Sequence, residues 1–407
     1  MPVASLRPAV IVAPVRASSF EPVRRLWRLA TAADIVFVVG QFVLSRLVYL
    51  AGGVLTVGVL AGTPDKTVTF GTVLGRTPDV VHYLLVNADS AWYESVVKLG
   101  YLQMPFSAAQ PENWAFFPLF PALVRLAGGT EIAGILIANL AAWVACLLLS
   151  FEVRQMFGRS SARWTVLLLL FTPFSGVLSS YRPDSLVLLF SVVAWVAARR
   201  DRWWLAWAAV ALAALARPSG VVAALLVLAP VLASVRTSGW SRPAAGRLAG
   251  VVLPIAALAA FSIYLGMRTG NPLAWQGIQA AWGRAAVDPL VLVQRYWSDP
   301  LFIRQGWDFA AFNWTVLVIG CAAGVGLLTR RSWGLAAFTL VSLLLSPITG
   351  GVMQGIGRYA TGVFPIFMEI ASDRRIRGWR LPVLIVSAVL LALVGAWTYL
   401  GATVVLG

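Results

Sequence analysis

The residue types best suited to chemistry lie in one stretch, NADSAWYESVVKLGY, which runs from Asn87 to Tyr101. It places the carboxylate of Asp89 close to the aromatic side chains of Trp92 and Tyr93. A carboxylate can serve as a general base or as a substrate anchor, and the rings could stack on a sugar. Two simpler interpretations stay open, because a helix dipole favours an acid in its first turn and a membrane interface favours aromatic rings.

The residues that follow have structural explanations. Glu94 stands four residues before Lys98, which is the favourable order for an ion pair along a helix, and Tyr101 suits an interfacial aromatic belt. In AFFPLFP, Ala115 to Pro121, two prolines interrupt regular structure. We therefore expect a re-entrant or interfacial segment there, with a kinked helix start as the alternative.

Three arginines are candidates for binding an anion. Arg182 precedes Asp184 by two residues in a predicted tight turn, and these two could simply pair. Arg217 lies between two short apolar runs and Arg358 begins a later one, so both need an anionic partner. For Arg217 the options are a lipid phosphate, a substrate phosphate or an acid such as Asp184. A guanidinium group suits phosphate because its planar fork makes paired hydrogen bonds, although long side chains also snorkel to lipid headgroups.

A second group of aromatic and amide side chains occurs in NPLAWQGIQAAWGR, Asn271 to Arg284. Trp275, Gln279 and Trp282 are spaced to share one face of a short amphipathic helix. Such a helix could lie on the bilayer surface. It could also act as a lid that offers amide and aromatic groups to a sugar.

The composition sets the class of protein. The 407 residues are 59% hydrophobic and 12% charged, with a mean hydropathy of +0.82, whereas soluble domains carry about 25% charged residues. We therefore predict an all-α polytopic membrane protein. The single histidine, His82, and the absence of a D-x-D motif predict no catalytic metal, and no motif suggests a cofactor. Cys146 and Cys321 lie in apolar runs as inert thiols, and the scattered arginines exclude nucleic acid as a partner.

Hydrophobic runs divided by Gly, Pro and Arg predict a bundle of about eleven transmembrane helices. Several runs are short, such as Trp203 to Ala216, and must be tilted, buried or extended by their neighbours. The predicted spans begin near Ala33, Ile132, Trp164, Ser185, Trp203, Gly220, Leu248, Phe309, Trp333, Tyr359 and Leu381.

The arginines concentrate in alternate loops, which predicts a cytoplasmic N-terminus. Residues 1–32 then form a basic cytoplasmic segment, and residues 33–407 form a single transmembrane domain. Its outer segments, 63–113 and 268–308, carry short interfacial helices, so the stretch around Asp89 is extracytoplasmic. The bias toward Arg, Ala, Val, Leu and Gly indicates a bacterial source and hence a bacterial plasma membrane.

In order and spacing, these segments resemble the GPI mannosyltransferase II (PIG-V) family, in particular its bacterial relatives. The resemblance covers nearly the whole chain from residue 33. It departs from the family at Pro183 and Asp184, where related sequences usually have Ser or Thr and then Glu. The residues that carry it are Asp89, Tyr93, Gly100 and Tyr101, then AFFPLFP, Pro173 to Ser175, Tyr181 to Leu186, ARPSG at 216–220, NPLAWQGIQAAWGR, Gly357 to Tyr359, and Phe364 with Pro365.

The resemblance implies a GT-C glycosyltransferase that moves a sugar, most often mannose, from a polyprenyl-phosphate donor. Asp89 corresponds to the family's first-loop aspartate and becomes the candidate catalytic base. Inversion would turn a β-linked donor into an α-glycoside on a glycolipid, glycan or protein hydroxyl. The candidate phosphate-binding residues are Arg217, Arg358 and Arg182. The candidate sugar- or acceptor-binding residues are Trp92, Tyr93, Tyr181, Asp184, Gln279, Trp282 and Tyr359.

Two other functions remain open from the sequence. One is a transporter or flippase of a lipid-linked saccharide, and the other is a membrane scaffold for another glycosyltransferase. Transporters often show paired repeats with broken helices, and no such halves stand out in this chain. The carboxylates also concentrate in the predicted outer segments and not in the middle of the spans.

Overall fold

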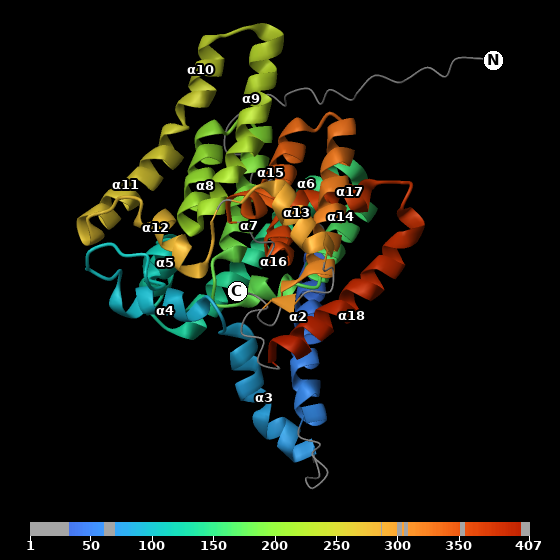
Figure 1. Ribbon diagram of the computed structural model, residues 1–407. Coiled ribbons are helices and arrows are strands. Elements are labelled where there is room, and N and C mark those ends of the chain that lie inside the picture. Colours follow the sequence, from blue (N-terminus) through green and yellow to red (C-terminus); the bar gives the residue numbers. More distant parts are fainter. Residues whose placement is uncertain are drawn as a thin grey trace, which may run out of the picture.

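The computed structural model describes residues 32–60, 70–285, 287–298, 303–304, 308–350 and 355–399. Over this part of the chain the predicted all-α class is confirmed, since the β structure there is a pair of two-residue strands, β1 (Ile303–Arg304) and β2 (Asp308–Phe309). The helices pack as a bundle (Figure 1). The basic segment predicted for residues 1–32 lies almost entirely outside the described residues.

The helical elements alternate long apolar helices with short turns. The α-helices are α2 (Ala32–Leu60), α3 (Phe70–Leu85), α4 (Ser90–Leu99), α5 (Leu119–Leu126), α6 (Glu131–Leu170), α7 (Asp184–Arg199), α8 (Trp203–Ala216), α9 (Ala224–Ser238), α10 (Arg242–Ala249), α11 (Val252–Thr269), α12 (Ala274–Gly277), α13 (Pro289–Ser298), α14 (Ala310–Thr329), α15 (Trp333–Gly350), α16 (Ile356–Gly362), α17 (Phe364–Ser372) and α18 (Arg380–Tyr399). The 3-10 turns are η1 (Asn113–Ala115), η2 (Ser175–Ser179), η3 (Pro218–Ala223), η4 (Ile278–Trp282) and η5 (Arg377–Trp379).

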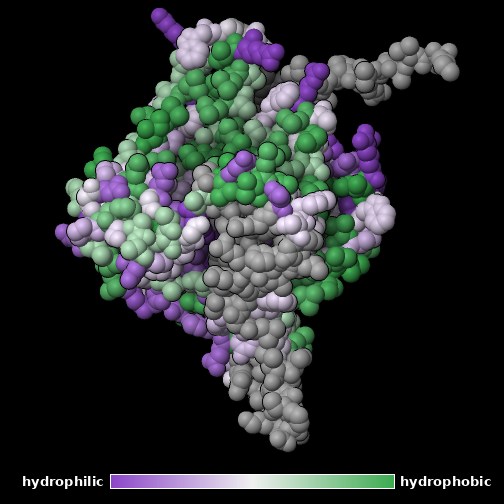
Figure 2. Space-filling view, viewed as in Figure 1, coloured by the Kyte–Doolittle hydropathy of each residue, from purple (hydrophilic) through white to green (hydrophobic). Residues whose placement is uncertain are grey.

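Within the described chain, 6 helical segments are long and apolar enough to cross a membrane. They are Ala32–Thr56, Glu131–Leu170, Pro218–Thr237, Arg242–Thr269, Phe312–Thr329 and Arg377–Tyr399. Figure 2 shows an apolar surface over α11 and its neighbours, between polar patches near the α9–α10 tip and around α4 and α5. The chain is therefore a multi-pass membrane protein, and the count of about eleven crossings stays a prediction.

Helix α6 joins two predicted spans, those beginning near Ile132 and Trp164. The chain leaves helical geometry between them at Gly158, which has φ 84° and ψ 171°. A positive φ of this kind strains side chains that carry a Cβ atom, whereas glycine adopts it readily. Arg159, just beyond the bend, donates from Nε to Asp34 Oδ1 at 2.8 Å and ties this end of α6 to the start of α2.

Buried carboxylates pair with the arginines at this end of the bundle. Glu152 accepts hydrogen bonds from Arg199 Nε at 2.7 Å and Arg200 Nη2 at 2.6 Å. Arg330, which follows α14, lies 3.0 Å from Glu369 near the end of α17. Helices α7, α14 and α17 thus finish at one ion-paired end. Helix α7 starts at the opposite end and spans about 24 Å for its 16 residues.

Both predicted outer segments contain helices and are not simple loops. The first includes α3, a 16-residue helix that packs on α2, and α4, the short helix expected after Asp89. The second includes α12, η4 and α13. In the stretch from Asn271 to Arg284, where a short amphipathic helix was predicted, α12 is followed directly by the 3-10 turn η4. The boundaries 33–407, 63–113 and 268–308 stay predictions.

The FFPLFP sequence turns the chain into α5 and builds the aromatic core beneath α4. Phe117 and Phe120 are fully buried, and Phe120 contacts Tyr93 edge-on with ring centroids 5.5 Å apart. Arg125 at the end of α5 donates to the carbonyl oxygens of Val97 and Val96 at 2.6 and 2.8 Å. These contacts fix the position of α4 and therefore of the residue that precedes it.

Candidate active site

Asp89 begins α4 without capping it. Its carbonyl oxygen accepts from the backbone N–H groups of Trp92 and Tyr93 at 3.1 and 3.2 Å, but its side chain makes no capping bond. Ala88, with φ 46°, turns the chain just before it. The carboxylate is therefore directed away from its own helix, which disfavours the interpretation of Asp89 as a simple helix-start acid.

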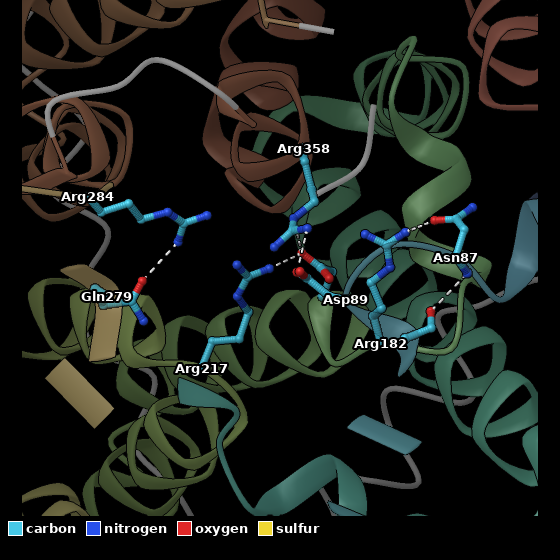
Figure 3. Close-up of polar contacts among 9 residues, drawn as sticks. Asn87, Asp89, Arg182, Arg217, Gln279, Arg284 and Arg358 are labelled. Carbon is cyan, nitrogen blue, oxygen red and sulfur yellow. Dashed lines mark hydrogen bonds and ion pairs between the residues drawn. The ribbon is translucent and has the colours of Figure 1, made fainter. Parts of the chain in front are cut away.

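Asp89 is bonded to an arginine that is far away in the sequence. Arg358 of α16 donates from Nη1 to Asp89 Oδ2 at 2.8 Å (Figure 3). The Arg358 side chain is 2% exposed, whereas the Asp89 side chain is 26% exposed. The carboxylate thus reaches the surface of the site while its cationic partner is enclosed.

Asp184 connects the second arginine to the first. Arg217 Nη1 donates to Asp184 Oδ1 at 2.6 Å, and Arg358 Nε lies 3.4 Å from the same oxygen. Asp184, one of the three partners that the sequence left open for Arg217, is therefore in contact with it. The other oxygen, Asp184 Oδ2, is buried and has no hydrogen-bond partner among the described residues. A bound hydroxyl group could satisfy it, since buried polar atoms are rarely left unpaired.

Arg182 is fully buried and donates a hydrogen bond to Asn87 Oδ1. Asn87 in turn donates from Nδ2 to the carbonyl oxygen of Tyr83 at 2.9 Å, at the end of α3. Arg182 therefore ties the turn before α7 to the turn that carries Asp89. The sequence raised a pairing with Asp184 for this arginine and gave no reason to select Asn87.

The cluster carries more positive than negative charge. Three guanidinium groups, those of Arg182, Arg217 and Arg358, surround the carboxylates of Asp89 and Asp184, which leaves one positive charge. Burial raises the pKa of Asp89, but the guanidinium groups, led by Arg358, outweigh it and lower that pKa to about 2. Asp89 is therefore ionised at neutral pH. The surplus charge is suited to a monoanion.

The ring of Tyr359 contacts two of the arginines. The Cζ atoms of Arg217 and Arg358 lie 5.1 and 5.3 Å from the centroid of its ring. Cation–π contacts at such distances contribute about 0.5–2 kcal/mol each. The predicted sugar-binding residue thus lies at the site, where it contacts the guanidinium groups.

The other predicted sugar-binding aromatics fall into two groups. Tyr93 and Tyr181 are buried in the aromatic core, at 4% and 0% exposure, so the structure does not bring them to the surface of the site. Trp92 and Trp282 are partly exposed and contact each other edge-on at 5.8 Å. This contact joins the two predicted outer segments.

Gln279 accepts a hydrogen bond from Arg284 Nη1 at 3.1 Å (Figure 3). Arg284 was not singled out from the sequence, and neither was Asn87, although each stands at one end of a quoted motif. In each motif, the aromatic and acidic residues gave the clearer indication of a binding or catalytic site.

Arg46 of α2 is a third residue that the sequence did not suggest. It is buried and donates to Leu170 O at 3.1 Å, to Ser175 Oγ at 2.9 Å and to Ser175 O. It thereby holds η2, the turn that leads to Arg182. Among the described residues, its hydrogen-bond partners in these contacts are carbonyl and hydroxyl oxygens, not carboxylates.

No group of three His, Cys, Asp or Glu side chains that could hold a metal ion occurs in the described part of the chain. The cluster around Asp89 offers two carboxylates, and both are bonded to arginine. The expectation of a metal-independent reaction remains a prediction.

No protein-family model matches the chain, and no curated protein matches it. Three similar solved structures are ArnT from Cupriavidus metallidurans bound to undecaprenyl phosphate (18% identity, TM-score 0.48, 93% of this chain and 77% of that one), the apo oligosaccharyltransferase of Archaeoglobus fulgidus (13%, 0.47, 89% and 56%), and the arabinosyltransferase EmbB of Mycobacterium smegmatis (18%, 0.44, 89% and 32%). These likenesses are distant. The function proposed below rests instead on Asp89 and its arginines.

Proposed function

We propose that this chain is a GT-C glycosyltransferase that transfers a sugar from a polyprenyl-phosphate donor to a hydroxyl acceptor on the extracytoplasmic face of the membrane. The observation that carries the proposal is the ion pair between the partly exposed carboxylate of Asp89 and the buried guanidinium of Arg358. Base and phosphate-binding group thus lie in contact. They occupy the end of the bundle opposite the ion pairs at the ends of α7, α14 and α17.

A lipid phosphate explains why the charges are arranged in this way. A donor anchored by a polyprenyl chain reaches the protein from the bilayer, and its phosphodiester carries one negative charge. That charge matches the surplus left by Arg182, Arg217 and Arg358 over the two aspartates. Arginine suits the task because its fork binds two phosphate oxygens at once. Stabilising charge that develops on the departing phosphate is the electrostatic part of catalysis.

Asp89 acts as the base in this proposal. While paired with Arg358 alone it holds its charge strongly, with a pKa of about 2, and is a poor proton acceptor. When the donor phosphate binds Arg358, the negative charge of the phosphate partly neutralises the guanidinium group. The pKa of Asp89 then rises, and Asp89 becomes a better proton acceptor once the donor is bound. The acceptor hydroxyl then attacks the anomeric carbon and gives its proton to Asp89. Attack from the face opposite the phosphate inverts the linkage, from a β-linked donor to an α-glycoside.

The sugar that we propose is mannose, because of the resemblance to the PIG-V family. Trp92 and Trp282, which are partly exposed and in contact, are the ring surfaces available for stacking. The unpartnered Asp184 Oδ2 is an acceptor for a sugar hydroxyl. The acceptor substrate is a hydroxyl on a glycolipid, a glycan or a protein.

The test is Asp89→Asn in the purified full-length protein with radiolabelled polyprenyl-phosphate mannose. We expect transfer to fall by about 10²–10⁴-fold, the usual range for loss of a general base. Asp79→Asn is the matched control, because Asp79 is an exposed aspartate on α3. Undiminished transfer by Asp89→Asn would eliminate Asp89 as the base. Movement of the donor across liposomes without a glycosidic product would support transport instead.

A further inference from the structure

A fourth arginine, Arg284, faces the same cluster from another side. It follows η4, and Figure 3 shows its side chain reaching toward Arg217 and Arg358. Its Nη1 donates a 3.1 Å hydrogen bond to Gln279 Oε1, a neutral acceptor. Among the described residues it forms no ion pair with a carboxylate. Because burial of a charge without an opposite charge is costly, this arginine is a candidate for binding an anion.

Arg284 acts on the reacting groups through space. Its charge contributes to the field at Asp89, after those of Arg358, Arg182 and Arg217. It also acts on the hydroxyl of Tyr359, whose ring contacts Arg217 and Arg358. Arg284 therefore acts on the same carboxylate as the three arginines of the cluster.

The charges of substrate and product differ by one unit. The intact donor is a phosphodiester with one negative charge, which the surplus of Arg182, Arg217 and Arg358 already matches. When the bond between the anomeric carbon and the phosphate oxygen breaks, its electron pair stays on that oxygen. The product is a phosphate monoester, whose second pKa is about 6 in phosphoamino acids. It is therefore largely a dianion at neutral pH.

We propose that Arg284 binds the leaving phosphate in the transition state and the product, and contributes little to binding of the intact donor. This proposal rests on the glycosyltransferase function above. The acceptor oxygen bonds to the anomeric carbon as the bond to the phosphate oxygen breaks, and its proton goes to Asp89. Asp89, with a pKa of about 2, then releases that proton to water. The surplus of the three arginines returns to one while the phosphate facing Arg284 carries two negative charges. Arg284 exchanges its bond to the neutral Gln279 amide for a bond to that charge. Interactions that strengthen only in the transition state accelerate the chemical step.

The experiment compares wild type, Arg284→Gln and Arg284→Lys in the full-length protein. Three quantities are measured: the single-turnover rate at saturating donor, the donor dissociation constant, and inhibition by polyprenyl phosphate. For Arg284→Gln we expect the rate to fall by roughly 10²-fold, as when one charge-stabilising donor is removed, with the donor dissociation constant nearly unchanged. Arg284→Lys, which keeps the charge, should recover part of the rate.

The pH dependence of product inhibition separates this role from a structural one. Above about pH 7 the phosphate is a dianion, so polyprenyl phosphate should inhibit Arg284→Gln at least tenfold less strongly than wild type. Near pH 5 it is mainly a monoanion, and the two proteins should be inhibited almost equally. Arg268→Gln is the matched control, because Arg268 also bonds a glutamine oxygen, that of Gln103 at 2.7 Å.

Two results would overturn the inference and leave the proposed function intact. One is an equal loss of donor and product affinity in Arg284→Gln at every pH. The other is unchanged product inhibition above pH 7. Failure of the proposed function looks different, because the wild-type protein would then neither transfer the sugar nor be inhibited by polyprenyl phosphate.

Discussion

Arg358 interacts with two carboxylates at once, so its removal would affect both of them. Its Nη1 is bonded to Asp89 and its Nε lies 3.4 Å from Asp184. Removing one member of such a buried group leaves the others uncompensated, which costs about 3–5 kcal/mol. We therefore regard Arg358 as a residue whose loss reduces stability as well as activity, so that Asp89 is the sharper position for a test of chemistry.

The pH dependence of Asp89 follows from its lowered pKa. In the folded protein the pKa is about 2, against an ordinary value of 3.8. A group with a lowered folded pKa stabilises fully above its unfolded pKa, and this stabilisation is lost as the pH falls toward the folded value. We expect Asp89 to contribute no acid limb to kcat/KM between about pH 5 and pH 8. Initial-rate profiles check this, and a limb near pH 6 that moves in Arg358→Lys would contradict it.

The sequence predicted individual site residues better than it predicted their partners. Asp89, Arg217 and Arg358 stand out as charges beside apolar runs. However, 269 residues separate Asp89 from Arg358, and such a pairing depends on how distant helices pack. Arg182 likewise bonds Asn87, and its separation of two residues from Asp184 gives no indication of that partner. The spacing of residues along the sequence does not indicate which distant residue an arginine will contact.

At the scale of elements, the connection between α8 and η3 positions Arg217. Helix α8 ends at Ala216, and η3 begins directly after Arg217. The chain returns so closely that a Cβ atom on Gly220 would lie 2.0 Å from the carbonyl oxygen of Ala213. Glycine at this position lets η3 pack against the last turn of α8, and the turn points Arg217 at Asp184.

Gly220→Ala should therefore displace Arg217. We expect a loss of about 1–3 kcal/mol of stability, the range for overpacking, together with weaker donor binding. Thermal unfolding and donor titration measure the two effects. Gly246→Ala in α10 is the control, because nothing lies within 4 Å of a Cβ atom there, and alanine is a better helix former than glycine. Equal behaviour of the two variants would show that the α8–η3 contact is unimportant for Arg217.

The elements themselves were largely predictable, because apolar runs and their breakers are local signals. The run at Trp203 to Ala216 matches α8 residue for residue, and the break after it follows from Pro218 and Gly220. The change of helix type was less predictable. The helical spacing of Trp275, Gln279 and Trp282 holds locally, but the chain tightens into a 3-10 turn after Gly277. Phe106, distant in the sequence, packs so closely there that an added Cβ atom on Gly277 would lie 2.7 Å from it.

At the scale of the molecule, arginines outnumber their acid partners at both ends of the bundle. At one end Glu152 pairs with both Arg199 and Arg200. At the other end three arginines surround Asp89 and Asp184. We expect the first end to face the cytoplasm and the second to face outward, as the loop arginines predict.

Cysteine labelling in intact cells tests this orientation. In a background with Cys146→Ala and Cys321→Ala, we expect Ser107→Cys to react with a membrane-impermeant maleimide. Thr237→Cys, which is equally exposed at the end of α9, should not react until the cells are opened. Labelling of Thr237→Cys alone in intact cells would invert the orientation and place Asp89 in the cytoplasm.

Arg46 also has a consequence for biogenesis. It enters the growing chain 129 residues before Ser175, whose oxygens receive its hydrogen bonds. At about 5–20 residues per second, ribosomes need roughly ten seconds to supply that partner. During this interval a lone guanidinium in the lipid would be costly. Helix α2 must therefore wait beside water or the insertion machinery until η2 emerges, and a nascent chain stalled before Ser175 should be released from the membrane more easily than one stalled after it.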